Sequence, residues 1–175
     1  MNALFTGNGP LRVTETGDHE DFDITYVPND SWVGLGDLMW IDQPVGTGWS
    51  YGEHAAQSLD EIGNDFVTFM LNFYEEFPVY KTRDLVLTGE SFAGKFLSYS
   101  TRAILEYNAD NSNSFTFPIQ SLTLYNPLVD TPTERLHQHE LPFAIGLFDE
   151  FQIDQVEVLR RRCEEAVSRG WGPDD

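Results

Sequence analysis

The protein has 175 residues, of which 41% are hydrophobic and 14% aromatic, enough apolar side chains to form a buried core. Ten Lys and Arg against 29 Asp and Glu give a formal net charge of -19. Such a charge repels nucleic acid and anionic membrane surfaces, so neither is an expected partner. No stretch approaches the roughly 20 apolar residues of a membrane helix, and the first residues do not resemble a signal peptide. We therefore expect one globular domain without an export signal of its own.

The N-terminal third contains three strand-like segments. Residues 11–13 and 22–27 are predicted to form an antiparallel edge. Residues 37–41 form a short apolar run that predicts a buried strand, and the Pro- and Gly-containing stretch 42–48 predicts a tight loop after it. A loop that follows a buried strand is a common location for a functional site.

The clearest helical pattern begins after Ser58, which forms a capping box with Glu61. Apolar residues then recur at helical spacing as far as Pro78. They are Ile62, Phe66, Phe69, Met70, Phe73 and Phe77. The phenylalanine stripe could line a ligand groove, but it favours core packing because a helix that covers a sheet needs such a face.

After this helix, strands alternate with helices. Residues 85–88 predict a strand, which a sharp turn connects to a helix that reaches about Tyr107. A polar loop over 108–114 leads to a second buried strand over 119–125. This alternation predicts an α/β fold with a mostly parallel sheet flanked by helices.

The C-terminal part is predicted to be helical over 143–148 and 156–167. The single cysteine, Cys163, lies in the second of these segments, so no disulfide can form within the chain and a packing role is favoured.

The turn between the strand and the helix reads Gly-Glu-Ser-Phe-Ala-Gly over residues 89–94. Small residues two positions before and after Ser91, here Gly89 and Ala93, permit a strained turn that exposes the serine. Backbone N–H groups at the helix start, beginning with that of Phe92, then point to where an oxyanion would form. The bare pattern has roughly a one in ten chance of arising in a chain of this length, but its strand–turn–helix context strengthens it. Ser91 is therefore the predicted nucleophile, and Phe92 supplies half of the predicted oxyanion hole.

This turn closely resembles the Gly-Glu-Ser-Tyr-Ala-Gly elbow of the serine carboxypeptidases. Residues 40–51, Trp-Ile-Asp-Gln-Pro-Val-Gly-Thr-Gly-Trp-Ser-Tyr, resemble the Asp-Gln-Pro-x-Gly-x-Gly-Phe-Ser-Tyr signature of that family. Residues 77–78 are similar to its Phe-Phe-x-x-Phe-Pro segment, and residues 125–127, Tyr-Asn-Pro, lie where members have Gly-Asn-Gly. The resemblance extends from about Leu4 to Cys163.

The resemblance implies a partial α/β-hydrolase fold, with a sheet core over about 1–130 and the start of an inserted helical cap region over 131–175. It implies removal of single residues from peptide C-termini through an acyl-enzyme on Ser91, usually at acidic pH. The Phe92 N–H would stabilise the oxyanion, and Glu90 would bind the terminal carboxylate by sharing a proton with a second carboxyl group. Neither a metal nor a cofactor is expected.

Peptide or protein C-termini are therefore the expected binding partners, and the oligomeric state stays open. The resemblance and the sequence pI near 4.2 fit a vacuolar, lysosomal or secreted protein, because an acidic chain repels itself least where carboxylates begin to protonate.

The sequence departs from the family pattern at the substrate-binding positions. The Gly-Gly-Pro-Gly-Cys-Ser-Ser stretch, which supplies the second oxyanion N–H, does not precede Leu4. Gly7 lies where members usually have the glutamate that pairs with the one beside the serine. Lys95 and Ser98 replace a typical His and Pro on the helix after the elbow.

The triad residues that follow the nucleophile are also expected to be missing. An α/β-hydrolase supplies its acid and its histidine from strands after the nucleophile strand, and about one such strand remains here. His137 and His139 precede the expected strand of the acid, so neither is expected to act as the base, and the chain alone is expected to be inactive. Two alternatives remain: an acyltransferase that uses Ser91 on the same scaffold, and a truncated, non-catalytic binding or structural module.

Overall fold

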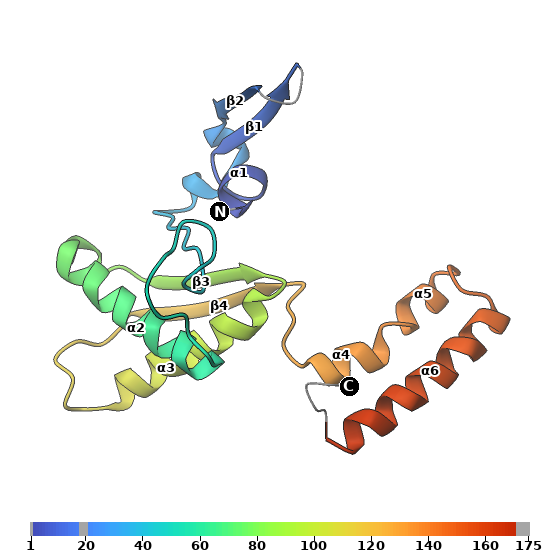
Figure 1. Ribbon diagram of the computed structural model, residues 1–175. Coiled ribbons are helices and arrows are strands. Elements are labelled where there is room, and N and C mark those ends of the chain that lie inside the picture. Colours follow the sequence, from blue (N-terminus) through green and yellow to red (C-terminus); the bar gives the residue numbers. More distant parts are fainter. Residues whose placement is uncertain (1, 18–20, 171–175) are drawn as a thin grey trace. The chain divides into compact units, whose positions relative to one another are not determined.

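The computed structural model describes residues 2–17 and 21–170 (Figure 1). The chain divides into two compact units, Met1–Ser58 and Leu59–Asp175, which we describe separately. The single domain that the sequence predicts stays a prediction. No helix in the described part of the chain combines the length and the apolar character that crossing a bilayer requires.

The first unit contains a short helix and a two-stranded antiparallel sheet. Its elements are α1 (Asn2–Thr6), β1 (Leu11–Thr16) and β2 (Asp21–Tyr26), followed by two short 3-10 turns over Pro28–Asp30 and Trp32–Gly34. Leu11 pairs with Tyr26 and Val13 with Ile24, which confirms the predicted antiparallel pairing. The predicted strand at 37–41 is wrong. A strand needs a hydrogen-bonded neighbour, and in the described part of the chain β1 pairs with β2 and β3 with β4.

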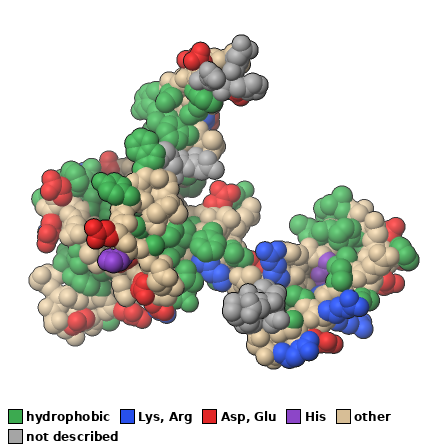
Figure 2. Space-filling model, viewed as in Figure 1, with side chains coloured by type: hydrophobic (Ala, Val, Ile, Leu, Met, Phe, Trp, Pro, Cys, Tyr) green, Lys and Arg blue, Asp and Glu red, His purple; other side chains and the backbone are tan. Residues whose placement is uncertain are grey.

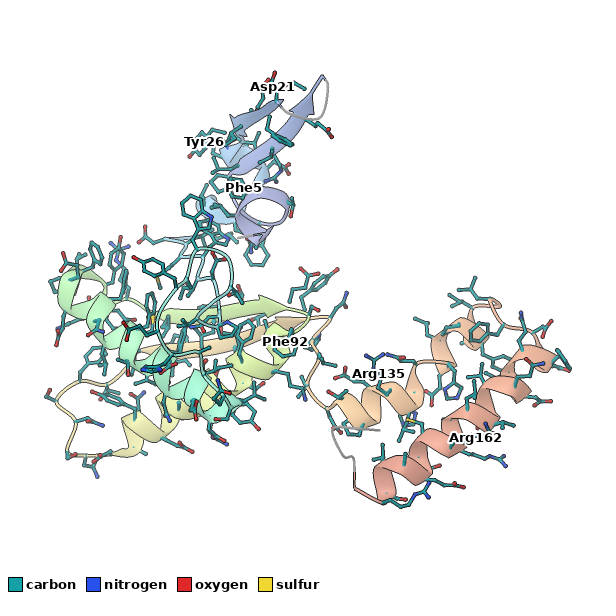
Figure 3. All side chains as sticks on the ribbon, in the orientation of Figure 1. Phe5, Asp21, Tyr26, Phe92, Arg135 and Arg162 are labelled. Atoms are coloured by element: carbon teal, nitrogen blue, oxygen red, sulfur yellow. The ribbon has the colours of Figure 1, made fainter. Side chains whose placement is uncertain are left out.

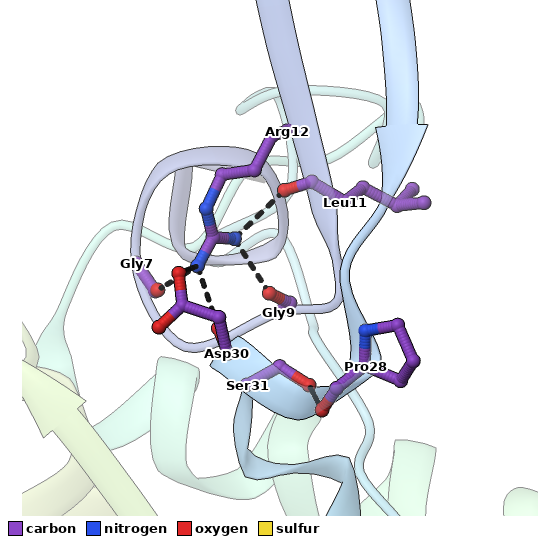
Figure 4. Close-up of polar contacts among 7 residues, drawn as sticks. All are labelled: Gly7, Gly9, Leu11, Arg12, Pro28, Asp30 and Ser31. Atoms are coloured by element: carbon purple, nitrogen blue, oxygen red, sulfur yellow. Dashed lines mark hydrogen bonds and ion pairs between the residues drawn. The ribbon is translucent and has the colours of Figure 1, made fainter.

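Arg12 holds the segments on either side of this sheet together (Figure 4). One terminal nitrogen of its guanidinium donates to the carbonyls of Gly9 at 2.7 Å and Leu11 at 2.9 Å. The other donates to the Asp30 carbonyl at 2.7 Å and lies 3.4 Å from the Asp30 carboxylate. Because these acceptors occupy both terminal nitrogens, Arg12 has a structural role in this unit.

The core of the second unit is a strand–helix–strand arrangement with a second helix packed on the first. Its elements are α2 (Leu59–Glu76), β3 (Leu85–Glu90), α3 (Ala93–Ala109) and β4 (Ile119–Tyr125). β3 and β4 are parallel, with Leu87 opposite Leu122. The sequence predicted all four elements in this order, although β3 and α3 each extend two residues beyond their predicted ends.

The buried residues come from the faces at which α2, α3 and the sheet meet. They include Ile62, Phe66, Met70, Tyr74, Leu87, Leu97, Ala103, Ile104 and Phe117. The predicted core packing of the phenylalanine stripe is confirmed only in part: Phe66 is 3% exposed, whereas Phe69 and Phe77 are 39% and 48% exposed. The two helices approach closely at Gly63, where a Cβ would lie 2.8 Å from the Tyr99 carbonyl oxygen.

Three helices complete the second unit: α4 (Thr131–His137), α5 (Glu140–Ala144) and α6 (Glu150–Ser168). The helix predicted over 143–148 is correct only for residues 143 and 144, because α5 ends at Ala144 and Gly146 adopts a positive φ of 76°. None of the three helices contains a fully buried residue. Five of the ten basic residues lie on or beside α4 and α6: Arg135, Arg160, Arg161, Arg162 and Arg169. Figure 2 shows Lys and Arg side chains in blue on the surface of the chain.

Candidate active site

Ser91 lies in the two-residue turn between β3 and α3, outside both elements. Its φ of 58° is in the left-handed region, which side chains with a Cβ seldom adopt. Among the described non-glycine residues, only Ser91 and Asn126 have a positive φ. The predicted sharp turn is therefore present, with Ser91 exposed at its tip.

Backbone hydrogen bonds hold Ser91 in this strained conformation. Its N–H donates to the carbonyl of Tyr125, the last residue of β4, at 3.1 Å. Its carbonyl accepts from the N–H of Gly94 at 3.0 Å and from that of Leu128 at 2.8 Å. Both backbone polar groups of the predicted nucleophile are therefore hydrogen-bonded. The bonds with Tyr125 and Leu128 tie its conformation to the end of β4 and the segment that follows.

Steric contacts explain why small residues surround the serine. A Cβ on Gly89 would collide with the Ala93 methyl group and lie 2.6 Å from Cδ1 of Leu97. A Cβ on Gly94 would lie 2.6 Å from the Leu128 carbonyl oxygen and 2.8 Å from the Pro127 Cβ. The sequence identified the requirement at Gly89 and Ala93 but missed the one at Gly94, which depends on the distant segment after β4.

The N–H of Phe92 has no acceptor in the part of the chain that the structure describes. Phe92 directly precedes α3, and Figure 3 labels its side chain there. The ring is 52% exposed and lies 6.2 Å from that of Phe96, centroid to centroid. The Phe92 N–H is thus free to donate to a ligand beside Ser91.

Glu90, the predicted carboxylate-binding residue, is exposed at the end of β3. Within residues 2–17 and 21–170, no hydrogen bond or ion pair involves its carboxylate. The second carboxyl group that proton sharing would require is therefore not bonded to Glu90 in this structure.

The two histidines near α5 have carboxylate partners of their own. His137 Nδ1 lies 2.5 Å from Oε1 of Glu140, and His139 Nε2 lies 2.7 Å from Oε1 of Glu157. These contacts help to lower the pKa of both carboxyl groups, although the hydrogen bond from Arg160 has the larger effect on Glu157. No histidine of the described residues is hydrogen-bonded to Ser91; His19 lies outside them.

The segment 126–130, which we call the strap, runs from the end of β4 past the elbow to the start of α4. Lys95, on the first turn of α3, donates from Nζ to the carbonyl of Val129 at 2.6 Å. At the same end of the strap, Oε1 of Glu134 accepts from the N–H groups of Val129 at 2.6 Å and Asp130 at 3.1 Å. Sequence reasoning missed this arrangement. A carboxylate in the first turn of α4 is a capping signal that could have indicated the helix start.

In the first unit, residues 42–50 form the loop that resembles the long family signature. The Asp42 carboxylate accepts from the Trp49 N–H at 3.0 Å, and the Ser50 hydroxyl donates to the Asp42 carbonyl at 2.7 Å. Gly48 has a φ of 55°, and a Cβ there would collide with the Asp42 carboxylate. The predicted loop is therefore tightly folded around Asp42.

Comparison with known proteins identifies the class to which this fold and elbow belong. The sequence profile of the serine carboxypeptidase family matches residues 1–169. The chain belongs to the serine carboxypeptidase family, and its fold is a partial α/β-hydrolase.

Individual relatives give the extent of the match. The pheromone-processing carboxypeptidase KEX1 of Eremothecium gossypii is 30% identical over 175 residues, which is 97% of this chain and 28% of the relative. Serine carboxypeptidase-like 44 of Arabidopsis thaliana is 30% identical over 156 residues, 79% of this chain and 33% of the relative. The crystal structure of Kex1(Δ)p, a prohormone-processing carboxypeptidase from Saccharomyces cerevisiae, matches 99% of this chain and 38% of its own, with a TM-score of 0.83 and 25% identity. The chain thus spans about a third of the length of these relatives.

Proposed function

We propose that this chain carries the nucleophile and part of the oxyanion hole of a serine carboxypeptidase. The observation that supports this most is the backbone of Ser91, an exposed serine with a φ of 58° between a strand and a helix. Such a turn presents the hydroxyl to a substrate while the helix start presents free N–H groups beside it.

In the proposed reaction, Ser91 Oγ attacks the carbonyl carbon of the last peptide bond as a base accepts its proton. The Phe92 N–H donates to the resulting oxyanion. The C–N bond then breaks, the same base returns its proton to the departing amine, and the C-terminal residue leaves. Water hydrolyses the ester on Ser91 and completes the cycle. Glu90, next to Ser91, would bind the substrate's terminal carboxylate.

We further propose that residues 1–175 do not provide the base. The described histidines of the second unit are paired with carboxylates, and none is hydrogen-bonded to Ser91. A serine hydroxyl without a base to accept its proton is a poor nucleophile near neutral pH. The base and its acid would then come from sequence that corresponds to the other two thirds of the relatives.

A chimera tests the proposed function directly. Residues 1–175 would replace the segment of Saccharomyces cerevisiae Kex1 that aligns with them, so that the rest of the enzyme supplies the remaining triad residues. We expect the chimera to release C-terminal residues from blocked dipeptides. Ser91→Ala should abolish this release, whereas Ser114→Ala, at an exposed position in the loop after α3, should not. A folded chimera that is inactive with Ser91 intact would refute the proposal.

The same chimera separates the two alternatives. An acyltransferase would use Ser91 in the same way but pass the acyl group to an alcohol, and the similarity to plant serine carboxypeptidase-like proteins supports testing for it. Adding an alcohol acceptor would then yield an ester in place of the free acid. A non-catalytic binding or structural module would give neither product.

We also propose an acidic location for the protein, in a vacuole, a lysosome or the exterior of the cell. The proposal is supported by the sequence pI near 4.2, because the repulsion among its carboxylates falls as they become protonated.

A further inference from the structure

We propose that Lys95 is a positioning residue that keeps Ser91 in its strained conformation by anchoring the strap, residues 126–130. The inference rests on the proposed function only in calling Ser91 the nucleophile.

The turn around Ser91 depends on hydrogen bonds from outside it. The Ser91 carbonyl accepts from the N–H of Gly94 within the turn, but its shortest bond, at 2.8 Å, comes from Leu128 in the strap. The Leu128 N–H can donate to Ser91 only while the strap lies against the elbow. A positive φ at a residue with a Cβ is unfavourable, so it persists only when surrounding contacts stabilise it.

A lysine side chain of α3 holds the strap beside the elbow. The Leu128 carbonyl packs against Gly94: a Cβ added at Gly94 would lie 2.6 Å from the Leu128 carbonyl oxygen. Immediately after Leu128, the Val129 carbonyl accepts a charge-assisted hydrogen bond of 2.6 Å from Lys95 Nζ. Lys95 belongs to the first turn of α3, the helix that begins two residues after Ser91. The lysine therefore connects the elbow helix to the residue next to Leu128.

Glu134 anchors the last two residues of the strap, Val129 and Asp130, from α4. Glu134 accepts from the N–H groups of Val129 and Asp130 and fixes the start of α4. The Lys95 and Glu134 contacts act on the two backbone polar groups of Val129, and only the Lys95 contact connects to α3. Removing Lys95 should therefore release the strap from the elbow while α4 keeps its capped first turn.

Amide hydrogen exchange measured by NMR on the 175-residue chain tests this without any catalytic reaction. In Lys95→Met, which keeps most of the side-chain length but loses the donor, we expect the Leu128 amide to exchange about three- to tenfold faster, the range that the loss of one partly exposed hydrogen bond gives. Lys95→Arg restores a cationic donor and should keep exchange within about twofold of wild type. The matched control is Lys81→Met, because Lys81 makes no side-chain hydrogen bond with the described residues.

The amide of the buried Met70 in α2 reports whether each variant is folded. If Lys95→Met loses protection there as well, Lys95→Gln replaces it, and Leu128 should then exchange about two- to threefold faster than in wild type. Unchanged exchange at Leu128 in the folded variant, or exchange in Lys95→Arg as fast as in Lys95→Met, would overturn the inference.

Kinetics in the Kex1 chimera distinguish positioning from mere structural support. We expect Lys95→Met to lower kcat at least about threefold while KM stays within about twofold, because binding is kept and the reacting hydroxyl is displaced. Lys95→Arg should restore kcat. An unchanged kcat alongside faster Leu128 exchange would refute the positioning role. A chimera without any turnover would count against the proposed function, and the exchange experiment would still decide whether Lys95 anchors the strap.

Discussion

Gly89 has little space around its α-carbon, although it is part of a regular strand. Because an added methyl group would meet Ala93 and Leu97 on the facing helix, the closeness of β3 and α3 depends on the absence of a side chain. The elbow thus requires a particular distance between strand and helix as well as a particular φ at Ser91.

We predict that Gly89→Ala lowers the free energy of unfolding by about 1–3 kcal/mol, the usual effect of overpacking a filled site. Gly36→Ala is the control, because a Cβ at Gly36 would meet no atom within 4 Å. Urea unfolding followed by circular dichroism gives both values. If Gly89→Ala were as stable as Gly36→Ala, β3 and α3 could move apart to admit a methyl group at no cost in the free energy of unfolding, and the prediction would be wrong.

Tyr74 places an ionisable phenol in the core of the second unit. Its side chain is part of the core, 3% exposed, and lies against the rings of Phe115 and Phe117. Burial raises the pKa of the Tyr74 phenol, because the charged phenolate would lose its hydration. An acid whose pKa is higher in the folded state stabilises the protein below the unfolded pKa and loses that contribution as the pH rises through the folded pKa.

We therefore predict that stability falls above about pH 10, the ordinary tyrosine value, and that Tyr74→Phe reduces this fall. Free energies of unfolding from urea titrations at pH 8 and at about pH 10.5 measure the effect. Tyr51→Phe serves for comparison, because Tyr51 is 93% exposed. Equal alkaline losses in the wild type and in Tyr74→Phe would contradict the prediction.

At the scale of the elements, α3 is joined to β4 by a loop that one side chain closes. Asn108 donates from Nδ2 to the Phe117 carbonyl at 2.9 Å and accepts from the Phe117 N–H at 2.8 Å. This pair of bonds fixes Phe117, which is 2% exposed, just before the strand begins. The Asn108 amide thus pairs with both backbone polar groups of Phe117, as a neighbouring strand would, and joins the two ends of the loop.

We predict that Asn108→Ala destabilises the protein by about 1–3 kcal/mol, since it leaves two backbone groups of a buried residue without partners. Asn111→Ala, in the same loop but exposed, should change stability by less than about 0.5 kcal/mol. Thermal unfolding of the two variants gives the comparison. Equal melting temperatures would mean that the aromatic packing around Phe117 is sufficient.

These elements also indicate how far the sequence alone could predict the structure. Periodicity predicted α2, β3, α3 and β4, because each buries a face or a run that repeats at its own period. The need for small residues at Gly89 and Ala93 was predictable because these residues are close neighbours in sequence, whereas the need at Gly94 depends on Pro127 and Leu128. The strap was not predictable, since the contact between Lys95 and Val129 joins residues 34 positions apart, and no local pattern indicates it. The predicted strand at 37–41 failed for a similar reason, as a strand requires a partner that its own residues do not specify.

For the whole molecule, the described residues include the proposed nucleophile, Ser91, and one proposed oxyanion donor, the Phe92 N–H. We predict that the purified 175-residue chain releases no measurable C-terminal residues from blocked dipeptides between about pH 4 and 8, a range that spans the ordinary Glu and His pKa values. A chromatographic assay of released amino acid tests this, with Ser91→Ala as the reference for zero turnover. Turnover that depends on Ser91 would mean that another group accepts its proton.

All the backbone hydrogen bonds described for Ser91 are made with residues between Gly94 and Leu128. This bears on which parts of the gene must be inherited together. The partners of Ser91 are Gly94, Tyr125 and Leu128, and the anchor of the strap is Lys95. Recombination with breakpoints before Leu59 and after Glu134 would therefore transfer Ser91 together with these partners and with α2, the helix that packs on α3. Residues 59–134 thus contain every hydrogen-bond partner described for the backbone of Ser91, so these bonds would be inherited as one continuous stretch of sequence.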